Sequence, residues 1–158
     1  MKKVILIFVL CLFVITIFPF RISALGGMEI SGRNRMYGGL SVGLLSFPIG
    51  ILADVYLPLS SLETIEQEIE EARFVEVNPY LALTIPIFTT KIYAAVAPIF
   101  IFDIEQLGFS FFNDWVKLKA GMQFGKGLVL FIEGMTSLNF DFELSGNYAV
   151  QLGIGLGF

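Results

Sequence analysis

The last eleven residues, Tyr148-Ala149-Val150-Gln151-Leu152-Gly153-Ile154-Gly155-Leu156-Gly157-Phe158, decide the fold class. Every second side chain from Tyr148 to Phe158 is large and apolar, and the residues between them are alanine, glutamine or glycine. Successive side chains of a β-strand point to opposite faces, so one face suits lipid and the other is small or polar. A helix would spread these glycines around its surface, and each of them would destabilise it.

The same period of two recurs along the chain and predicts seven strands. They cover residues 36–46, 49–59, 73–87, 91–104, 113–124, 127–138 and 147–158, and the alternation is weakest in 91–104, where both faces are apolar. Because bacterial single-chain barrels have even strand numbers, we expect an eighth strand at Gly27 to Ser31, before a turn at 32–35. The predicted fold is all-β: an antiparallel, up-and-down transmembrane β-barrel of eight strands, after a cleaved signal peptide.

Two other fold classes compete with the barrel. Hydropathy alone makes Tyr80 to Ile104 a membrane helix, but Pro86, Pro98 and Thr89-Thr90-Lys91 favour two strands and a turn. A soluble sandwich also alternates, but its polar face meets water, and here that face carries few charges. Strands that cross a bilayer must close into a barrel, because lipid cannot satisfy their backbone groups. The in-strand prolines at positions 58, 79, 86 and 98 count against the prediction, since proline cannot donate to a sheet.

The connections between the predicted strands alternate in length. Read from the C-terminus, they are a loop near 139–146, a tight turn at Gly125-Lys126-Gly127, a loop near 104–113, a turn at 88–90, a long loop near 60–73 and a turn near Phe47-Pro48. Short turns on one rim and longer loops on the other are typical of outer-membrane barrels. Two aromatic girdles fit the same picture, with Phe47, Phe88, Phe124 and Phe158 near the short turns and Phe74, Phe112, Phe140 and Tyr148 near the long loops.

Residues 1–24 are typical of a secretory signal peptide. Lys2 and Lys3 precede an apolar run that ends at Pro19, and Ile22-Ser23-Ala24 offers a small-residue cleavage site. A retained transmembrane anchor is the alternative. Cleavage after Ala24 would remove three of the ten Lys and Arg residues and leave a net charge of 7 − 14 = −7. The domain prediction is a signal peptide at 1–24 and an outer-membrane β-barrel at 25–158.

The end of the chain resembles the C-terminal insertion signal of bacterial outer-membrane β-barrel proteins. That pattern is polar, any, Gly, any, any, hydrophobic, any, aromatic, and it is filled by Gln151, Gly153, Leu156 and the terminal Phe158. The resemblance implies the bacterial outer membrane as location, and the lipid bilayer and the barrel-assembly machinery as partners. It implies no particular activity, because a fold does not fix a function.

Composition excludes several function classes. The chain has no His and one Cys, Cys11, so Ser-His-Asp and Cys-His catalytic sites are impossible. The acidic mature charge gives no nucleic-acid footprint. We expect no cofactor, no metal and no enzymatic activity. An enzyme acting on membrane lipids would need an unusual base such as Glu133 or Lys119.

Six charged residues fall on the inward parity of the predicted strands. They are Asp54, Glu76, Lys91, Lys117, Lys119 and Glu133. An eight-stranded barrel is just wide enough to be filled by side chains, so three acids and three bases indicate mutual neutralisation. Pairing Phe124 with Leu128 across the turn at Gly125 predicts Lys119 directly opposite Glu133, and Gly121 opposite Phe131.

Two loop segments carry weaker signals. Ser60 and Glu63 fit a capping box, and the acidic stretch to Arg73 has helical spacing, which predicts a solvated helix at the rim or a site for cations. Aromatic residues at 108–112 and 140–142 indicate either an apolar contact surface or packing in the girdle.

The leading functional hypothesis is a small, non-enzymatic outer-membrane barrel with a structural or surface-interaction role, whose surface partner the sequence does not name. The alternative is a narrow channel or carrier for small or apolar solutes.

Overall fold

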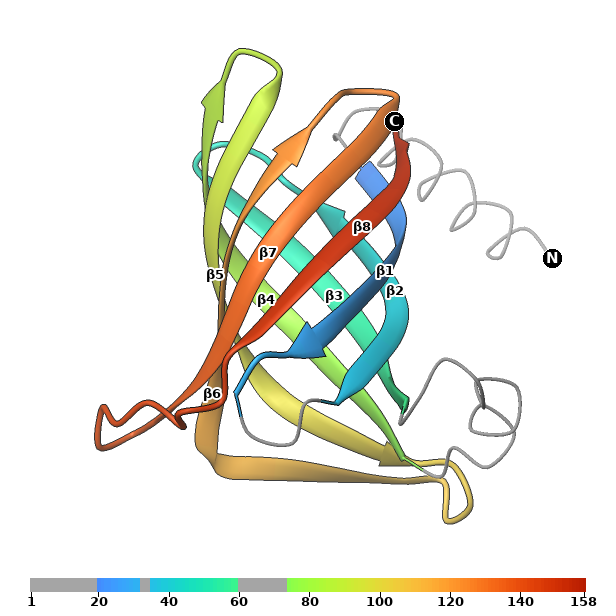
Figure 1. Ribbon diagram of the computed structural model, residues 1–158, viewed down its shortest axis with the longest axis vertical. Coiled ribbons are helices and arrows are strands. Elements are labelled where there is room, and N and C mark those ends of the chain that lie inside the picture. The colour runs from blue at the N-terminus through green and yellow to red at the C-terminus, as the bar shows by residue number, and fades with distance from the viewer. Residues whose placement is uncertain (1–19, 32–34, 60–73) are drawn as a thin grey trace, which may run out of the picture.

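The computed structural model describes residues 20–31, 35–59 and 74–158, and these form one closed β-barrel (Figure 1). Its eight antiparallel strands follow chain order around the barrel. They are β1 (Phe20–Glu29), β2 (Met36–Leu44), β3 (Ile49–Leu59), β4 (Phe74–Ile87), β5 (Thr90–Asp103), β6 (Gly108–Phe124), β7 (Leu128–Asn139) and β8 (Ala149–Gly157). Within the described residues, no helix is long and apolar enough to cross a membrane. The predicted eight-stranded, up-and-down barrel is confirmed.

The eighth strand starts seven residues earlier than the sequence analysis placed it. β1 pairs with β2 over Phe20–Met28 and with β8 over Arg21–Glu29, so it closes the barrel. The prediction at Gly27 to Ser31 missed the alternation that runs back to Phe20: Arg21, Ser23 and Leu25 are buried, whereas Ile22 and Ala24 are exposed. Phe20–Ala24, which the sequence analysis placed in the signal peptide, therefore form half of a barrel strand.

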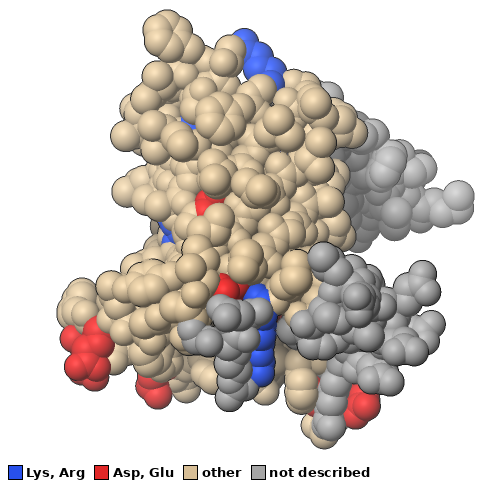
Figure 2. All heavy atoms as spheres, in the orientation of Figure 1, with Lys and Arg blue, Asp and Glu red and all other residues tan. Residues whose placement is uncertain are grey.

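The outer surface of the barrel is apolar because each strand turns its large aliphatic side chains outward. Leu81, Leu83 and Ile85 of β4 and Leu152, Ile154 and Leu156 of β8 are each more than half exposed, and the residues between them are mostly covered. Figure 2 shows one face of this surface, where charged side chains gather toward the lower end and most of the upper part has few. A continuous apolar belt of this kind matches the hydrocarbon core of a bilayer.

Three short turns connect strands at the upper end of Figure 1, which also holds the C-terminus. They are residues 45–48, 88–89 and 125–127. The opposite end holds the connections 104–107 and 140–148, together with the strand ends Glu29, Met36, Leu59 and Phe74. The expected acidic helix at 60–73 and most of the turn at 32–35 lie outside the described residues.

One predicted long loop is instead part of the sheet. β6 begins at Gly108, so the predicted loop near 104–113 is reduced to residues 104–107. Phe111 pairs with Phe100 and Phe109 with Phe102, with ring centroids 5.1 and 4.7 Å apart. Opposed aromatic side chains stabilise cross-strand pairing, and this extends the β5–β6 hairpin beyond its neighbours.

The prolines are accommodated by interruptions of the sheet. Pairing of β4 with β5 stops after Val77↔Phe100 and resumes at Leu81↔Val96, which sets Pro79 opposite Pro98 inside the gap. The register of β5 with β6 also shifts between Pro98 and Phe100. β6 turns a corner in its first half, and the hairpin beyond it runs across the lower end of the molecule (Figure 1).

Candidate functional site: the filled barrel interior

The barrel interior holds a cluster of four buried charges, here called the central cluster: Arg21 of β1, Asp54 of β3, Lys119 of β6 and Glu133 of β7. Each of the four residues is at most 2% exposed. All four sit on the inward parity of their strands, so the alternation that makes the outer face apolar also brings them together. Two cations and two anions make the cluster neutral.

Lys119 joins the two carboxylates of the cluster. Its Nζ forms an ion pair with Asp54 Oδ2 and lies 3.2 Å from Glu133 Oε2. The hydroxyl of Tyr56 donates to Asp54 Oδ2 at 2.6 Å. The ammonium also lies 4.2 Å from the centroid of the Tyr80 ring, within the range of a cation–π contact.

The Glu133 carboxylate is contacted by four donors from four other strands. Arg21 Nη2 lies 3.3 Å from Oε1, Lys119 lies 3.2 Å from Oε2, and the side chains of Tyr93 and Gln151 donate to the same carboxylate. A buried ion is tolerated only where pairing and hydrogen bonds compensate its desolvation. Glu133 therefore ties β1, β5, β6 and β8 to its own strand β7.

The guanidinium of Arg21 also contacts the polar residues around the cluster. It donates to Gln123 Oε1 at 2.9 Å and to Ser41 Oγ at 3.2 Å. Its Cζ lies 4.3 Å from the centroid of the Phe131 ring. The planar, multidentate group thus bridges several sides of the barrel, which a lysine cannot do equally well.

The other inward charges lie toward the two ends. Lys117 and Glu76 form an ion pair at the long-loop end, and both are partly exposed. Lys91 donates to the backbone carbonyl of Leu45 at 2.6 Å, beside a short turn. Three acids were expected to neutralise three bases. In the structure the third base is Arg21 rather than Lys91, which lies outside the central cluster.

The expected contact between Lys119 and Glu133 is present, but the predicted register is wrong by two residues. Phe124 pairs with Leu130 rather than Leu128, and Glu133 stands opposite Gly121. The side chains of Lys119 and Glu133 meet diagonally. A register shift of two residues keeps both of them on the inner face of the sheet. Phe131 is instead opposite Gly153, where an added Cβ would collide with its ring.

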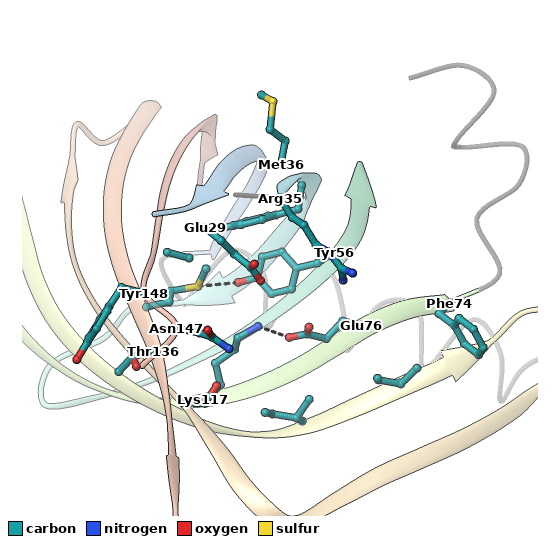
Figure 3. A pocket seen from close by; sticks show the side chains of 16 residues that line it. Glu29, Arg35, Met36, Tyr56, Phe74, Glu76, Lys117, Thr136, Asn147 and Tyr148 are labelled. Atoms are coloured by element: carbon teal, nitrogen blue, oxygen red, sulfur yellow. Dashed lines mark hydrogen bonds and ion pairs between the residues drawn. The ribbon is translucent and has the colours of Figure 1, made fainter. Parts of the chain in front are cut away.

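A cavity of about 340 Å³ opens at the long-loop end of the barrel, next to the central cluster. Figure 3 shows Lys117 and Glu76 pointing toward one another across it, with Tyr56 nearby. Its further lining includes Glu29, Arg35, Phe74 and Tyr148. We call it the outer cavity. It mixes both charge signs with aromatic surface, which suits a small polar or amphipathic solute better than a strongly charged one.

The described residues contain no group of three or more His, Cys, Asp or Glu side chains placed to hold a metal ion. The central cluster contains two basic and two acidic side chains, and they neutralise each other within a packed interior. What this arrangement does physically is to fill the lumen and link the strands across it.

The four residues of the predicted insertion signal occupy β8 and the end of the chain. Gln151 and Gly153 face the interior, where Gln151 contacts Glu133 and Gly153 makes room for Phe131. Leu156 is 55% exposed on the outer face, and Phe158 is 66% exposed at the short-turn end. Each of the four thus has a place in the barrel in addition to its place in the motif.

Sequence reasoning missed Arg21, the fourth charge of the central cluster. It lay inside the predicted signal peptide and was counted as part of the export signal. The period-two pattern would have found it, because Arg21, Ser23 and Leu25 alternate with Ile22 and Ala24 in the same phase as the rest of β1.

The fold resembles solved eight-stranded membrane barrels. A structure titled De novo design of transmembrane beta-barrels matches with a TM-score of 0.58 and 10% identity, covering 89% of this chain and 95% of that one. The N-terminal β-barrel domain of Pseudomonas aeruginosa OprF matches with a TM-score of 0.57 and 12% identity, over 89% and 97%. Neisserial surface protein A (NspA) matches with a TM-score of 0.50 and 10% identity, over 89% and 95%. No protein-family model and no curated protein sequence matches the chain. The similarity defines the class of fold: a small transmembrane β-barrel.

Proposed function

We propose that the chain is a bacterial outer-membrane β-barrel protein without enzymatic activity, with a structural role in the bilayer. The observation that carries the proposal is the central cluster, which crosses the lumen between the two ends of the barrel. Separating a buried ion from its partner costs roughly 3–5 kcal/mol. The cluster therefore links the strands across the lumen by stable ion pairs and opposes the passage of water and ions.

Three further features support the outer membrane as location. The apolar belt fits a bilayer, the terminal residues Gln151, Gly153, Leu156 and Phe158 fit the insertion signal that the barrel-assembly machinery recognises, and the first residues of the chain fit an export signal. Two structures with a similar fold, the OprF domain and NspA, are by their titles a Pseudomonas barrel domain and a Neisserial surface protein.

A surface-interaction role is supported by the long-loop end. The β5–β6 hairpin extends there with Phe109, Phe111 and Phe112 each about half exposed or more, and Phe140 and Phe142 follow in the β7–β8 loop. Exposed apolar side chains are unfavourable in water, so their concentration at this end indicates where a partner or the lipid headgroups would be contacted.

Planar-bilayer recording tests the structural role. The purified full chain should give no stepwise conductance, while a wide porin measured in the same bilayers gives clear steps. Defined single-channel steps from the wild-type chain would overturn the closed interior and with it the structural proposal.

The second candidate function is a narrow carrier for small or apolar solutes, and the outer cavity favours it. Tyr56 lines the cavity and donates to Asp54 of the central cluster, so a carrier would have to open the cluster for a solute to pass. Swelling of vesicles that contain the protein, measured with neutral solutes of increasing size, distinguishes the two. Solute entry that stops with bulkier solutes would favour the carrier.

A further inference from the structure

The first five residues of β1, Phe20–Ala24, make up nearly half of the seam that closes the barrel. Arg21 pairs with Gly157, Ile22 with Leu156, Ser23 with Gly155 and Ala24 with Ile154. At the end of the seam, the backbone amide of Phe158 donates to the carbonyl of Phe20 at 2.8 Å. The same residues pair with β2 on their other side.

Without these five residues β1 would be too short to span a bilayer. Leu25–Glu29 would remain, and five extended residues cover roughly 17 Å. A transmembrane strand needs about nine to eleven residues. The freed edges of β2 and β8 would then expose unpaired backbone groups at the depth of the hydrocarbon core, where each costs several kcal/mol.

Arg21 gives a second, independent reason why the folded barrel needs Phe20–Ala24. It is one of the two cations of the central cluster and contacts Glu133, Gln123, Ser41 and Tyr93. Without it the cluster would hold Lys119 against both Asp54 and Glu133, a net charge of −1 in a packed interior. An uncompensated buried charge strongly destabilises a fold.

We propose that the mature, folded protein retains Phe20–Ala24, with the peptide bond between Ala24 and Leu25 intact. Any export signal that is removed must then end ahead of Phe20. The small residues of Ile22-Ser23-Ala24 are explained by their places in the strand and do not require a cleavage site. Ser23 packs where Gly155 leaves room, and Ala24 faces outward beside Leu40 and Ile154. This inference does not depend on whether the barrel is structural or a carrier.

The N-terminus of the mature protein tests it directly. Folded protein from the membrane fraction is identified by its fast migration in unheated detergent gels, and its intact mass and N-terminal sequence are determined. We expect a first residue at or before Phe20, with Met1 included. A folded protein that starts at Leu25 overturns the proposal. Recovery from the inner membrane instead would contradict the proposed location but leave the N-terminal result decisive.

Ala24→Leu tests the cleavage pattern in the full chain. A signal-peptide cut after residue 24 needs a small side chain there, so leucine would block it and precursor would accumulate. We expect Ala24→Leu to have the wild-type N-terminus, because Ala24 is an exposed, outward-facing residue of the barrel. Ala94→Leu, at an outward position of β5, is the matched control. Accumulation of a longer precursor with Ala24→Leu alone would overturn the proposal.

Arg21→Met gives a readout that does not depend on the cleavage site. A residue that is absent from the mature protein cannot change its stability. We expect purified Arg21→Met to lose its fast-migrating band at a lower temperature than the wild type, Arg21→Lys to recover part of the difference, and the outward Ile22→Ala to stay near wild type. Wild-type stability for Arg21→Met, whatever its yield, would overturn the proposal.

Discussion

Lys119 compensates two buried carboxylates, Asp54 and Glu133, so its removal leaves a net negative charge inside the barrel. We expect Lys119→Met to lower the free energy of unfolding by roughly 3–5 kcal/mol. Adding Asp54→Asn should recover part of that loss, because Arg21 and Glu133 then balance each other. Urea unfolding in lipid vesicles, followed by the fluorescence of the single tryptophan, Trp115, measures both variants.

The matched control for the Lys119→Met and Asp54→Asn variants is Lys126→Met, which removes an exposed lysine from the turn between β6 and β7. Its effect should stay within about 0.5 kcal/mol. Strictly additive losses for Lys119→Met and Asp54→Asn would mean that the two side chains do not interact in the membrane.

The ring of Phe131 leaves no space for a side chain at Gly153. A Cβ at this residue would collide with Phe131, whereas a Cβ at Gly134, an exposed glycine of the neighbouring strand β7, meets nothing within 4 Å. We expect Gly153→Ala to cost about 1–3 kcal/mol through overpacking. Gly134→Ala should be neutral or slightly stabilising, because alanine reduces the entropy of the unfolded chain. The same urea titration compares them, and equal effects would place the Phe131 ring elsewhere.

Parity along a strand is the part of the interior that sequence predicts best. Asp54, Lys119 and Glu133 were placed inside from alternation alone, and a register error of two residues left that face unchanged. Their partners were predicted less well. The register across a hairpin depends on where the ladder starts, and Arg21 was missed because its segment resembled an export signal, although the alternation of β1 extends back to it.

At the scale of elements, the nine residues of β8, Ala149–Gly157, close the barrel against β1 and also carry most of the predicted insertion signal, which ends at Phe158. If the terminal aromatic residue directs insertion, Phe158→Ala should lower the amount of barrel in the membrane severalfold and raise the unassembled pool. Phe124→Ala, which removes another exposed rim aromatic, should assemble normally. Quantitative blotting of membrane and periplasmic fractions measures both.

Equal losses for Phe158→Ala and Phe124→Ala would indicate that both residues act only as girdle aromatics. Gly157→Ala is a poor control for this experiment. Its Cβ would collide with the backbone carbonyl of Lys126, so the substitution disturbs packing as well as sequence.

The β5–β6 hairpin marks the limit of predicting elements from local sequence. Phe109-Ser110-Phe111-Phe112 follows Gly108 and has no clear period, so it resembled a loop. It becomes a strand because Phe100 and Phe102 of β5 stand opposite Phe111 and Phe109. The opposed prolines Pro79 and Pro98 are likewise invisible to a single strand, since only the register sets them in one gap.

At the scale of the whole molecule, the closed barrel predicts behaviour that a helical membrane protein lacks. Unheated samples in detergent gels should run faster than boiled ones, because the closed hydrogen-bonded barrel stays compact. Far-UV circular dichroism of the unheated protein should show β-structure. A single band at all temperatures, together with a helical spectrum, would contradict the fold.

The outline of the molecule was predictable, and the shape of its interior was not. Alternation and the spacing of short turns predict seven strands, because both are local, and the even strand number of bacterial barrels supplies the eighth. The outer cavity depends on how side chains of all eight strands fill one cross-section, and on residues such as Glu29 and Asn147 that carry no pattern of their own.

Closure of the seam between β1 and β8 sets the order in which the molecule can be assembled. The first strand to leave the ribosome is paired with the last, so its open edge must be protected while all the others are made. The ion pair between Arg21 and Glu133, 112 residues apart, likewise forms only when the ring closes, and until then Lys119 faces both buried carboxylates without Arg21. Half-built barrels therefore carry both an open edge and stranded ions. Closure of the ring pairs the last two strand edges and completes the compensation of the buried charges, so it is the step that makes the barrel stable.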